Sequence, residues 1–114
     1  MNMRILLATA AAIAVVAPHA VRAADPFVRI IEPADGARLD AMALNRLVYK
    51  VDPGPGGDHV HVYADDKEIG ILRRLEGSYT LETLRPGPQT LCIKVVNKAH
   101  TPIGVQQCVK VTVE

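Results

Sequence analysis

Apolar and polar residues alternate in short runs along residues 27–114, and turn-forming residues separate the runs. In the run Asn45–Asp52, for example, Leu47, Tyr49 and Val51 occupy every second position. A period of two is typical of β-strands. The pattern predicts seven strands, over residues 27–32, 45–52, 59–64, 69–75, 78–84, 89–97 and 104–114. Turns that recur every eight to twelve residues favour a single antiparallel β-sandwich, with residues 39–43 as a short helical turn or an irregular connection.

The last two predicted strands indicate their own pairing. If the hairpin folds symmetrically about His100, residue i faces residue 200 − i, so Cys92 faces Cys108 and Leu91 faces Val109. Both apolar rows then lie on one face and both cysteines on the other. Opposed cysteines come close enough for a disulfide only in a non-hydrogen-bonded pair. We therefore predict a Cys92–Cys108 disulfide on the face away from the core. A pair of metal thiolates is the alternative, but the spacing differs from the C-x-x-C clusters of zinc sites.

Residues 1–23 have the pattern of a secretory signal peptide. Arg4 precedes an uncharged apolar run over residues 5–17, and Val21-Arg22-Ala23 fits a small-x-small cleavage site. We expect a mature domain over residues 24–114 in the periplasm, which meets the membrane only during export. A retained membrane anchor is the alternative. An exported location also favours the disulfide, because the periplasm is oxidising.

Charge and composition exclude several classes of function. Without Arg4 and Arg22, the mature part keeps eleven of the thirteen Lys and Arg residues against twelve Asp and Glu residues, and these are interspersed. It has no basic run and few aromatic residues, which argues against nucleic acid as a partner. Ser78 has no glycine-framed elbow, and the glycine-rich loop at 53–57 lacks a P-loop lysine. We therefore do not expect an enzyme.

Three histidines are the strongest candidate for a functional site. His59 and His61 form an His-x-His pair in a predicted strand, so both imidazoles project from the same face. Neutral imidazoles suit Zn(II) or Cu(II). Asp58 is a candidate partner that fixes an imidazole tautomer, and either Asp58 or Tyr63 is a candidate oxygen ligand.

The order of strands, with the motif L-x-P-G-x-x-x-L at 84–91, resembles bacterial immunoglobulin-like and fibronectin type III-like domains. The H-x-H strand together with N-K-A-H-T-P-I-G at 97–104 is similar to small periplasmic proteins of that fold. The resemblance implies that loops 53–57 and 97–104 emerge at the same end of the sandwich. It also implies that the third and sixth predicted strands are neighbours. His100 would then join His59 and His61 as a third metal ligand.

Two interpretations of these residues stay open at this point. In the first, His59, His61 and His100 hold a copper or zinc ion. In the second, the histidines are solvated or cap a turn, and the domain is a non-catalytic module that contacts an envelope protein. Lys94 favours the second interpretation if its ammonium lies on the histidine face, because it would repel a metal cation.

Overall fold

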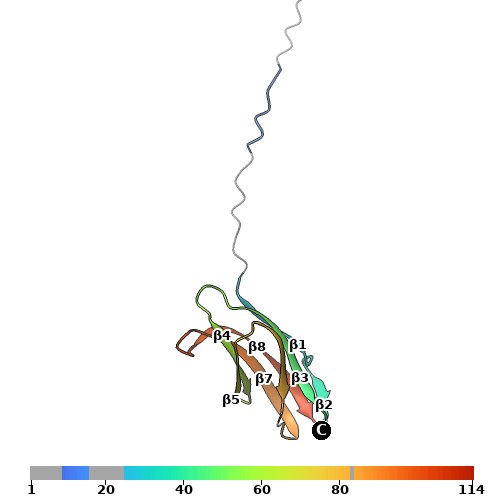
Figure 1. The fold of residues 1–114 in the computed structure, drawn as a ribbon. Coiled ribbons are helices and arrows are strands. Elements are labelled where there is room, and N and C mark those ends of the chain that lie inside the picture. The colour runs from blue at the N-terminus through green and yellow to red at the C-terminus, as the bar shows by residue number, and fades with distance from the viewer. Residues whose placement is uncertain (1–8, 16–24, 83) are drawn as a thin grey trace, which may run out of the picture.

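The computed structural model describes residues 9–15, 25–82 and 84–114, and every regular element among them is a β-strand (Figure 1). The strands are β1 (Phe27–Glu32), β2 (Ala37–Leu39), β3 (Asn45–Asp52), β4 (His59–Ala64), β5 (Lys67–Leu72), β6 (Glu76–Leu81), β7 (Gly87–Val96) and β8 (Pro102–Val113). Most of the signal peptide predicted over 1–23, including its cleavage site, lies outside the described residues. Among the described residues, no helix is long and apolar enough to cross a membrane.

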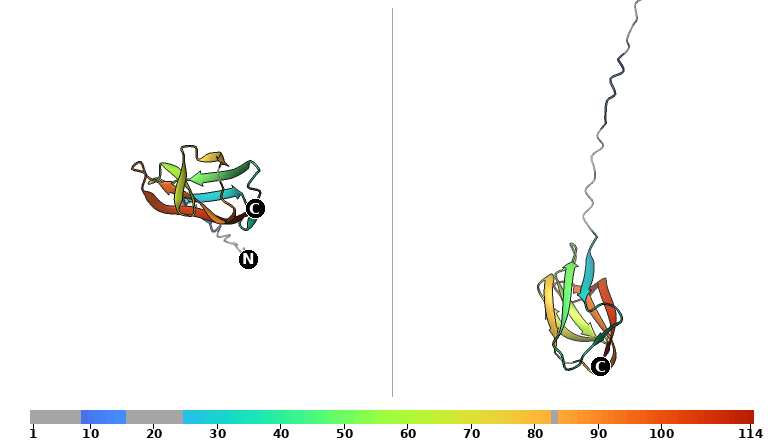
Figure 2. Two further views of the ribbon diagram at one scale, coloured as in Figure 1. Left: turned by 90° about the horizontal axis from the view of Figure 1, so that it is seen from below. Right: turned by 90° about the vertical axis from the view of Figure 1, so that its right-hand side faces the viewer.

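The strands form two sheets that face each other, as predicted for a sandwich (Figure 2). One sheet has the order β1-β3-β6 and the other has the order β2-β8-β7-β4-β5. The described residues thus contain eight strands, one more than the sequence predicts. The additional strand is β2, which pairs in parallel with β8 over only three residues. Such a short strand has no alternating pattern to reveal it, and this explains the difference.

Alternate residues of both sheets build the core. In β4, Val60 and Val62 are fully buried, and in β7 the same holds for Leu91 and Ile93. The apolar face of β3 completes this layer from the opposite sheet. The core cluster consists of Val28, Ile30, Leu47, Tyr49, Val51, Val60, Val62, Leu81, Leu91, Ile93, Val95, Val109, Val111 and Val113. The side chains on the other face of β4 therefore do not belong to the core.

The β7–β8 hairpin confirms the predicted register and the predicted disulfide. Cys92 pairs with Cys108 and Leu91 pairs with Val109. The two cysteines are bonded, with their Cα atoms 4.1 Å apart, a short separation typical of a non-hydrogen-bonded pair. The symmetry about His100 fails only near the tip. An irregularity after Lys94 places Val96 opposite Pro102, so the turn is centred one residue earlier than predicted.

The β4–β5 hairpin differs in detail from its prediction. Its turn is formed by Asp65 and Asp66, which both have positive φ, as two-residue hairpin turns require. β5 begins at Lys67, two residues earlier than predicted, and the register shifts between Val62 and Tyr63. Gly70 of β5 lies against the ring of Tyr79, where a Cβ atom would come within 2.8 Å. The sheet edge is thus packed tightly next to the strand that carries the histidines.

Candidate metal centre

β4 places His59 and His61 on the face opposite to the core. The two histidines alternate with Val60 and Val62, which point inward. Side chains on this outer face would ordinarily be exposed to solvent. His59 and His61 are nevertheless only 1% and 3% exposed. Their burial on an outer face means that something other than the core covers them.

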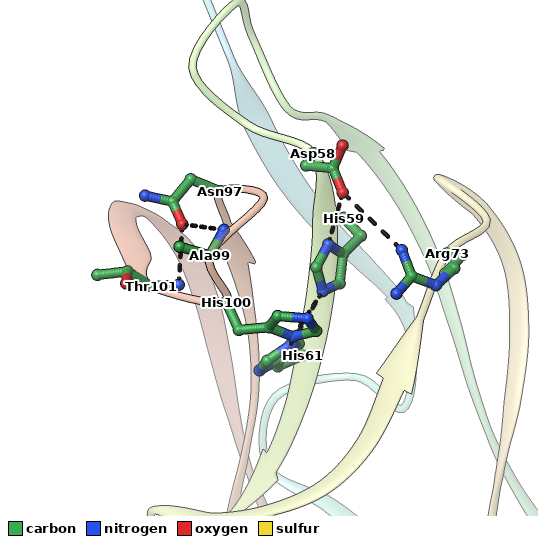
Figure 3. Close-up of polar contacts among 8 residues, drawn as sticks. All are labelled: Asp58, His59, His61, Arg73, Asn97, Ala99, His100 and Thr101. Atoms are coloured by element: carbon green, nitrogen blue, oxygen red, sulfur yellow. Dashed lines mark hydrogen bonds and ion pairs between the residues drawn. The ribbon is translucent and has the colours of Figure 1, made fainter.

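The loop between β7 and β8 brings His100 against this pair (Figure 3). β4 and β7 are neighbours in the sheet, as predicted, with His59 opposite Val96. The loop before β4 is held to β7 where the Asp58 N–H donates to the Val96 carbonyl at 2.8 Å. The two loops therefore lie at the same end of the sandwich. His100 itself is exposed, although its ring lies edge-on to His59 with centroids 4.6 Å apart.

One nitrogen from each imidazole points to a common centre. The Nε2 atoms of His59 and His61 are 3.1 Å apart. The Nδ1 atom of His100 lies 3.2 Å from the first and 3.1 Å from the second. The three nitrogens thus form a nearly equilateral triangle, from residues that the sequence separates by 41 and 39 positions. The structure confirms that the three predicted histidines lie together.

A carboxylate lies at the far nitrogen of each buried imidazole. Nδ1 of His59 donates to Asp58 Oδ2 at 2.8 Å, and Nδ1 of His61 lies 3.4 Å from Glu68 Oε1. Carboxylates only accept hydrogen bonds when ionised, so the hydrogen bond to Asp58 assigns the ring proton of His59 to Nδ1, and the nearby Glu68 carboxylate favours the same tautomer of His61. This tautomer leaves the Nε2 atoms of His59 and His61 as lone pairs directed to the centre.

Burial also favours the neutral form of His61. Desolvation lowers the pKa of His61 below its ordinary value of 6.5. The Glu68 carboxylate opposes this change, whereas the neighbouring His59, His100 and Arg73 act in the same direction as burial. Imidazole binds a metal only when it is neutral, so this environment favours the form of His61 that is able to bind one.

Lys94 and Tyr63 contact each other on the same outer face. Lys94 lies opposite His61 in the register and is thus on the histidine face, the arrangement that favours the second interpretation. Its Nζ atom lies 4.4 Å from the centre of the Tyr63 ring, which identifies a cation–π contact. The Tyr63 ring is 6.5 Å from the ring of His61. Tyr63 therefore contacts Lys94, and the cluster of candidate ligand atoms consists of the nitrogens of the three histidines.

Two charged residues at this site were missed by the sequence analysis. Glu68 precedes the strand predicted from residue 69, but it lies in β5 beside His61. Arg73 follows β5, and its guanidinium is 3.9 Å from the Asp58 oxygen that His59 also contacts. The signal that would have located Glu68 is a two-residue turn at Asp65 and Asp66, which pairs Glu68 with Tyr63 on the same face as His61. The register shift comes after this pair, at Ile69.

Comparisons with known proteins identify the fold. No protein-family model matches the chain, and no curated protein matches it. Fibronectin(III)-like modules of Clostridium thermocellum CbhA superpose with a TM-score of 0.63 at 14% identity, over 77% of this chain and 96% of that chain. An FMN-binding β-glucuronidase from Facaelibacterium prausnitzii gives a TM-score of 0.56 at 19% identity, over 81% of this chain but only 12% of the enzyme.

A lytic polysaccharide monooxygenase from Jonesia denitrificans is a third structural neighbour. It superposes with a TM-score of 0.52 at 16% identity, over 72% of this chain and 60% of that chain. Identities this low carry the fold and not the activity of these proteins. With its two sheets and its likeness to fibronectin(III)-like modules, the chain has a fibronectin type III-like β-sandwich fold.

Proposed function

We propose that this protein is an exported, non-catalytic binding protein that holds one transition-metal ion through His59, His61 and His100. The observation that carries the proposal is the pair of carboxylates behind the buried imidazoles. Because these carboxylates favour the tautomers with the proton on Nδ1, two Nε2 lone pairs face each other at 3.1 Å. Two acceptors this close repel each other unless a cation or a hydrogen lies between them. One metal ion would satisfy all three nitrogens together.

The dimensions of the nitrogen triangle favour a tetrahedral ion. Its centre is about 1.8 Å from each nitrogen, slightly less than a Zn–N bond of about 2.0–2.1 Å. His59, His61 and His100 would hold the ion through these three nitrogens, and three imidazoles suit a tetrahedral zinc site. Cu(II) prefers a square arrangement, in which one pair of ligands lies much farther apart. The triangle therefore favours zinc over copper, with one coordination position left for another ligand.

The chemistry of the surrounding groups supports binding rather than catalysis. Asp58 and Glu68 both face imidazole nitrogens, so neither is placed to act as a general base on a bound substrate. The predicted signal peptide and the disulfide both suit a periplasmic protein. We infer that the protein handles a metal ion in the periplasm.

Titration of the metal-free protein with Zn²⁺ and Cu²⁺ tests the proposal. One equivalent of Zn²⁺ should bind, and it should raise the melting temperature because only the folded state assembles the three nitrogens. The triple variant His59→Ala, His61→Ala, His100→Ala should lose both effects. Stoichiometric binding that survives in this variant would show that the ion is held elsewhere. Imidazole ligands in solution bind Cu²⁺ more tightly than Zn²⁺. The selectivity of the site is therefore judged by comparing the ratio of the Zn²⁺ and Cu²⁺ affinities of the protein with the same ratio for a flexible peptide that has three histidines.

The second candidate function is a non-catalytic module that contacts an envelope protein. It is favoured by β5, which is an edge strand of its sheet and exposes Ile69 and Ile71 by 36% and 49%. An edge strand offers unpaired backbone groups to a strand of a partner. If neither metal binds at micromolar concentration, this candidate replaces the first. Substitution of Ile71 by Lys would then be expected to weaken capture of the partner.

A further inference from the structure

The three histidines are supported in different ways. His59 and His61 belong to a strand between two neighbours, β5 and β7. His100 lies in the exposed hairpin loop and has a positive φ of 63°. A residue other than glycine rarely adopts this conformation unless its surroundings impose it. The feature that places His100 over the other two must therefore lie within the loop.

Asn97 makes the hydrogen bonds that shape this loop (Figure 3). Its side-chain Oδ1 accepts hydrogen bonds from the Ala99 N–H at 2.9 Å and from the Thr101 N–H at 3.0 Å. Its own carbonyl accepts from the His100 N–H at 3.0 Å, and its N–H donates to the Thr101 carbonyl at 2.9 Å. The residues on both sides of His100 are thus tied to one side-chain oxygen.

We propose that Asn97 is the positioning residue that preorganises His100 for the metal. The inference rests on the proposed metal-binding function and adds a determinant of affinity that does not touch the ion. When Oδ1 binds both flanking N–H groups, the backbone at His100 is confined to the conformation that points its Nδ1 at the other two histidines. The loop then loses little conformational freedom when the ion binds, and preorganisation of this kind strengthens binding.

Affinity measurements on three substitutions of one residue test the first part of the proposal. Asn97→Ala removes the acceptor, and we expect its Zn²⁺ affinity, measured by competition with a chromophoric chelator, to fall by about tenfold or more. Asn97→Asp keeps an oxygen that can accept from both N–H groups, so it should bind at least as tightly as the wild type. Asn97→Leu fills similar space without an acceptor and should behave like Asn97→Ala.

A double-mutant cycle with His100→Ala separates positioning from general stability. If Asn97 acts through His100, then Asn97→Ala should not weaken Zn²⁺ binding further once His100 has been removed. Asn97→Asp in the same background measures what its added charge alone contributes. Equal losses from Asn97→Ala with and without His100 would refute the positioning role. The cycle also decides the matter if Asn97→Ala folds less stably, because affinity is compared at a temperature where all variants are folded.

Asn45 provides the matched control. It also stabilises a connection, because its side-chain amide donates to the Asp40 carbonyl at 2.8 Å and the Ala43 carbonyl at 3.3 Å. It begins β3, at the end of that strand away from the loop that leads to His59. Asn45→Ala should lower the melting temperature without changing Zn²⁺ affinity. If wild-type protein binds no Zn²⁺, the proposed function itself fails. If it binds Zn²⁺ and Asn97→Ala binds equally well, only this inference fails.

Discussion

The carboxylate of Asp58 orients one imidazole of the histidine cluster. It lies directly before His59 in the chain and accepts the hydrogen bond of its Nδ1. The same oxygen is 3.9 Å from the guanidinium of Arg73, so the negative charge is shared between a ring N–H and a surface cation. Partners of this kind orient the ring and make its other nitrogen a better donor to a metal.

Replacement of Asp58 by Asn should weaken Zn²⁺ binding by about 10- to 100-fold, because an amide accepts from Nδ1 more weakly than a carboxylate and can also donate to it, so the His59 tautomer is no longer fixed. Affinity is measured by competition titration, and melting of the metal-free variant shows whether the fold is intact. Asp40→Asn is the control with the same change in net charge. Asp40 Oδ1 accepts from the Met42 N–H at 2.8 Å, in the connection before β3. Equal losses in both variants would point to long-range charge and not to the His59 tautomer.

Residue types and spacing allowed most of this site to be predicted, and the reasons for the failures are physical. His59 and His61 share a face because strands alternate, and Asp58 is their immediate neighbour. The position of His100 required the fold resemblance. Glu68 was missed because the predicted strand begins only at residue 69, whereas the turn at Asp65 and Asp66 already pairs Glu68 with Tyr63 on the face of His61. Asn97 also escaped notice, because a side chain that binds the backbone of its own loop leaves no periodic signal.

At the scale of elements, the β7–β8 hairpin was the easiest part of the fold to predict. Its two apolar rows and its two cysteines required the same register, and the structure has that register from Gly87 to Lys94. The short strand β2 was missed because its three residues, which pair in parallel with β8 at the sheet edge, are too few to show an alternating pattern. β5 was placed too late, because Lys67 and Glu68 have the polarity of turn residues. Pattern alone locates long central strands better than edges.

Loss of the hairpin disulfide should lower stability only moderately. Loop entropy sets an upper estimate of about 3 kcal/mol for a bridge across 16 positions, and the benefit should be smaller here because the hairpin already closes locally. We expect the variant Cys92→Ser, Cys108→Ser to unfold at a lower urea concentration than the oxidised protein. Wild type treated with a reductant serves as the control and should match it. Two free thiols in the untreated protein would contradict the bridge.

At the scale of the whole molecule, Tyr49 makes the stability of the fold depend on pH in the alkaline range. It is 2% exposed, and its hydroxyl donates to the Arg74 carbonyl at 2.9 Å. Burial raises its pKa above the ordinary value of 10.0, an effect that the charge of Arg74 partly offsets. The folded state therefore keeps the hydroxyl proton at a pH where the unfolded chain has released it. Stability from this group is complete below pH 10 and falls as the pH rises above it.

Urea denaturation between pH 9 and pH 11 checks this expectation. The free energy of unfolding of the wild type should decrease more steeply above pH 10 than that of Tyr49→Phe, which has no ionisable group at this position. At pH 8 the same variant should be less stable than the wild type, because it lacks the hydrogen bond to Arg74. Parallel curves for the two proteins at high pH would contradict the raised pKa.

The position of His100 inside the disulfide-closed hairpin has a consequence for chain connectivity. The disulfide joins residues 92 and 108, and an ion would join residue 59 to residue 100, which lies between those two cysteines. The two cross-links would therefore interlock, so that the chain from β4 to β8 becomes one closed network. The disulfide lowers the entropy cost of bringing His100 to the other two histidines, and the bound ion would then connect the hairpin to β4, an inner strand of the sheet. Release of the ion would open only the second of these links.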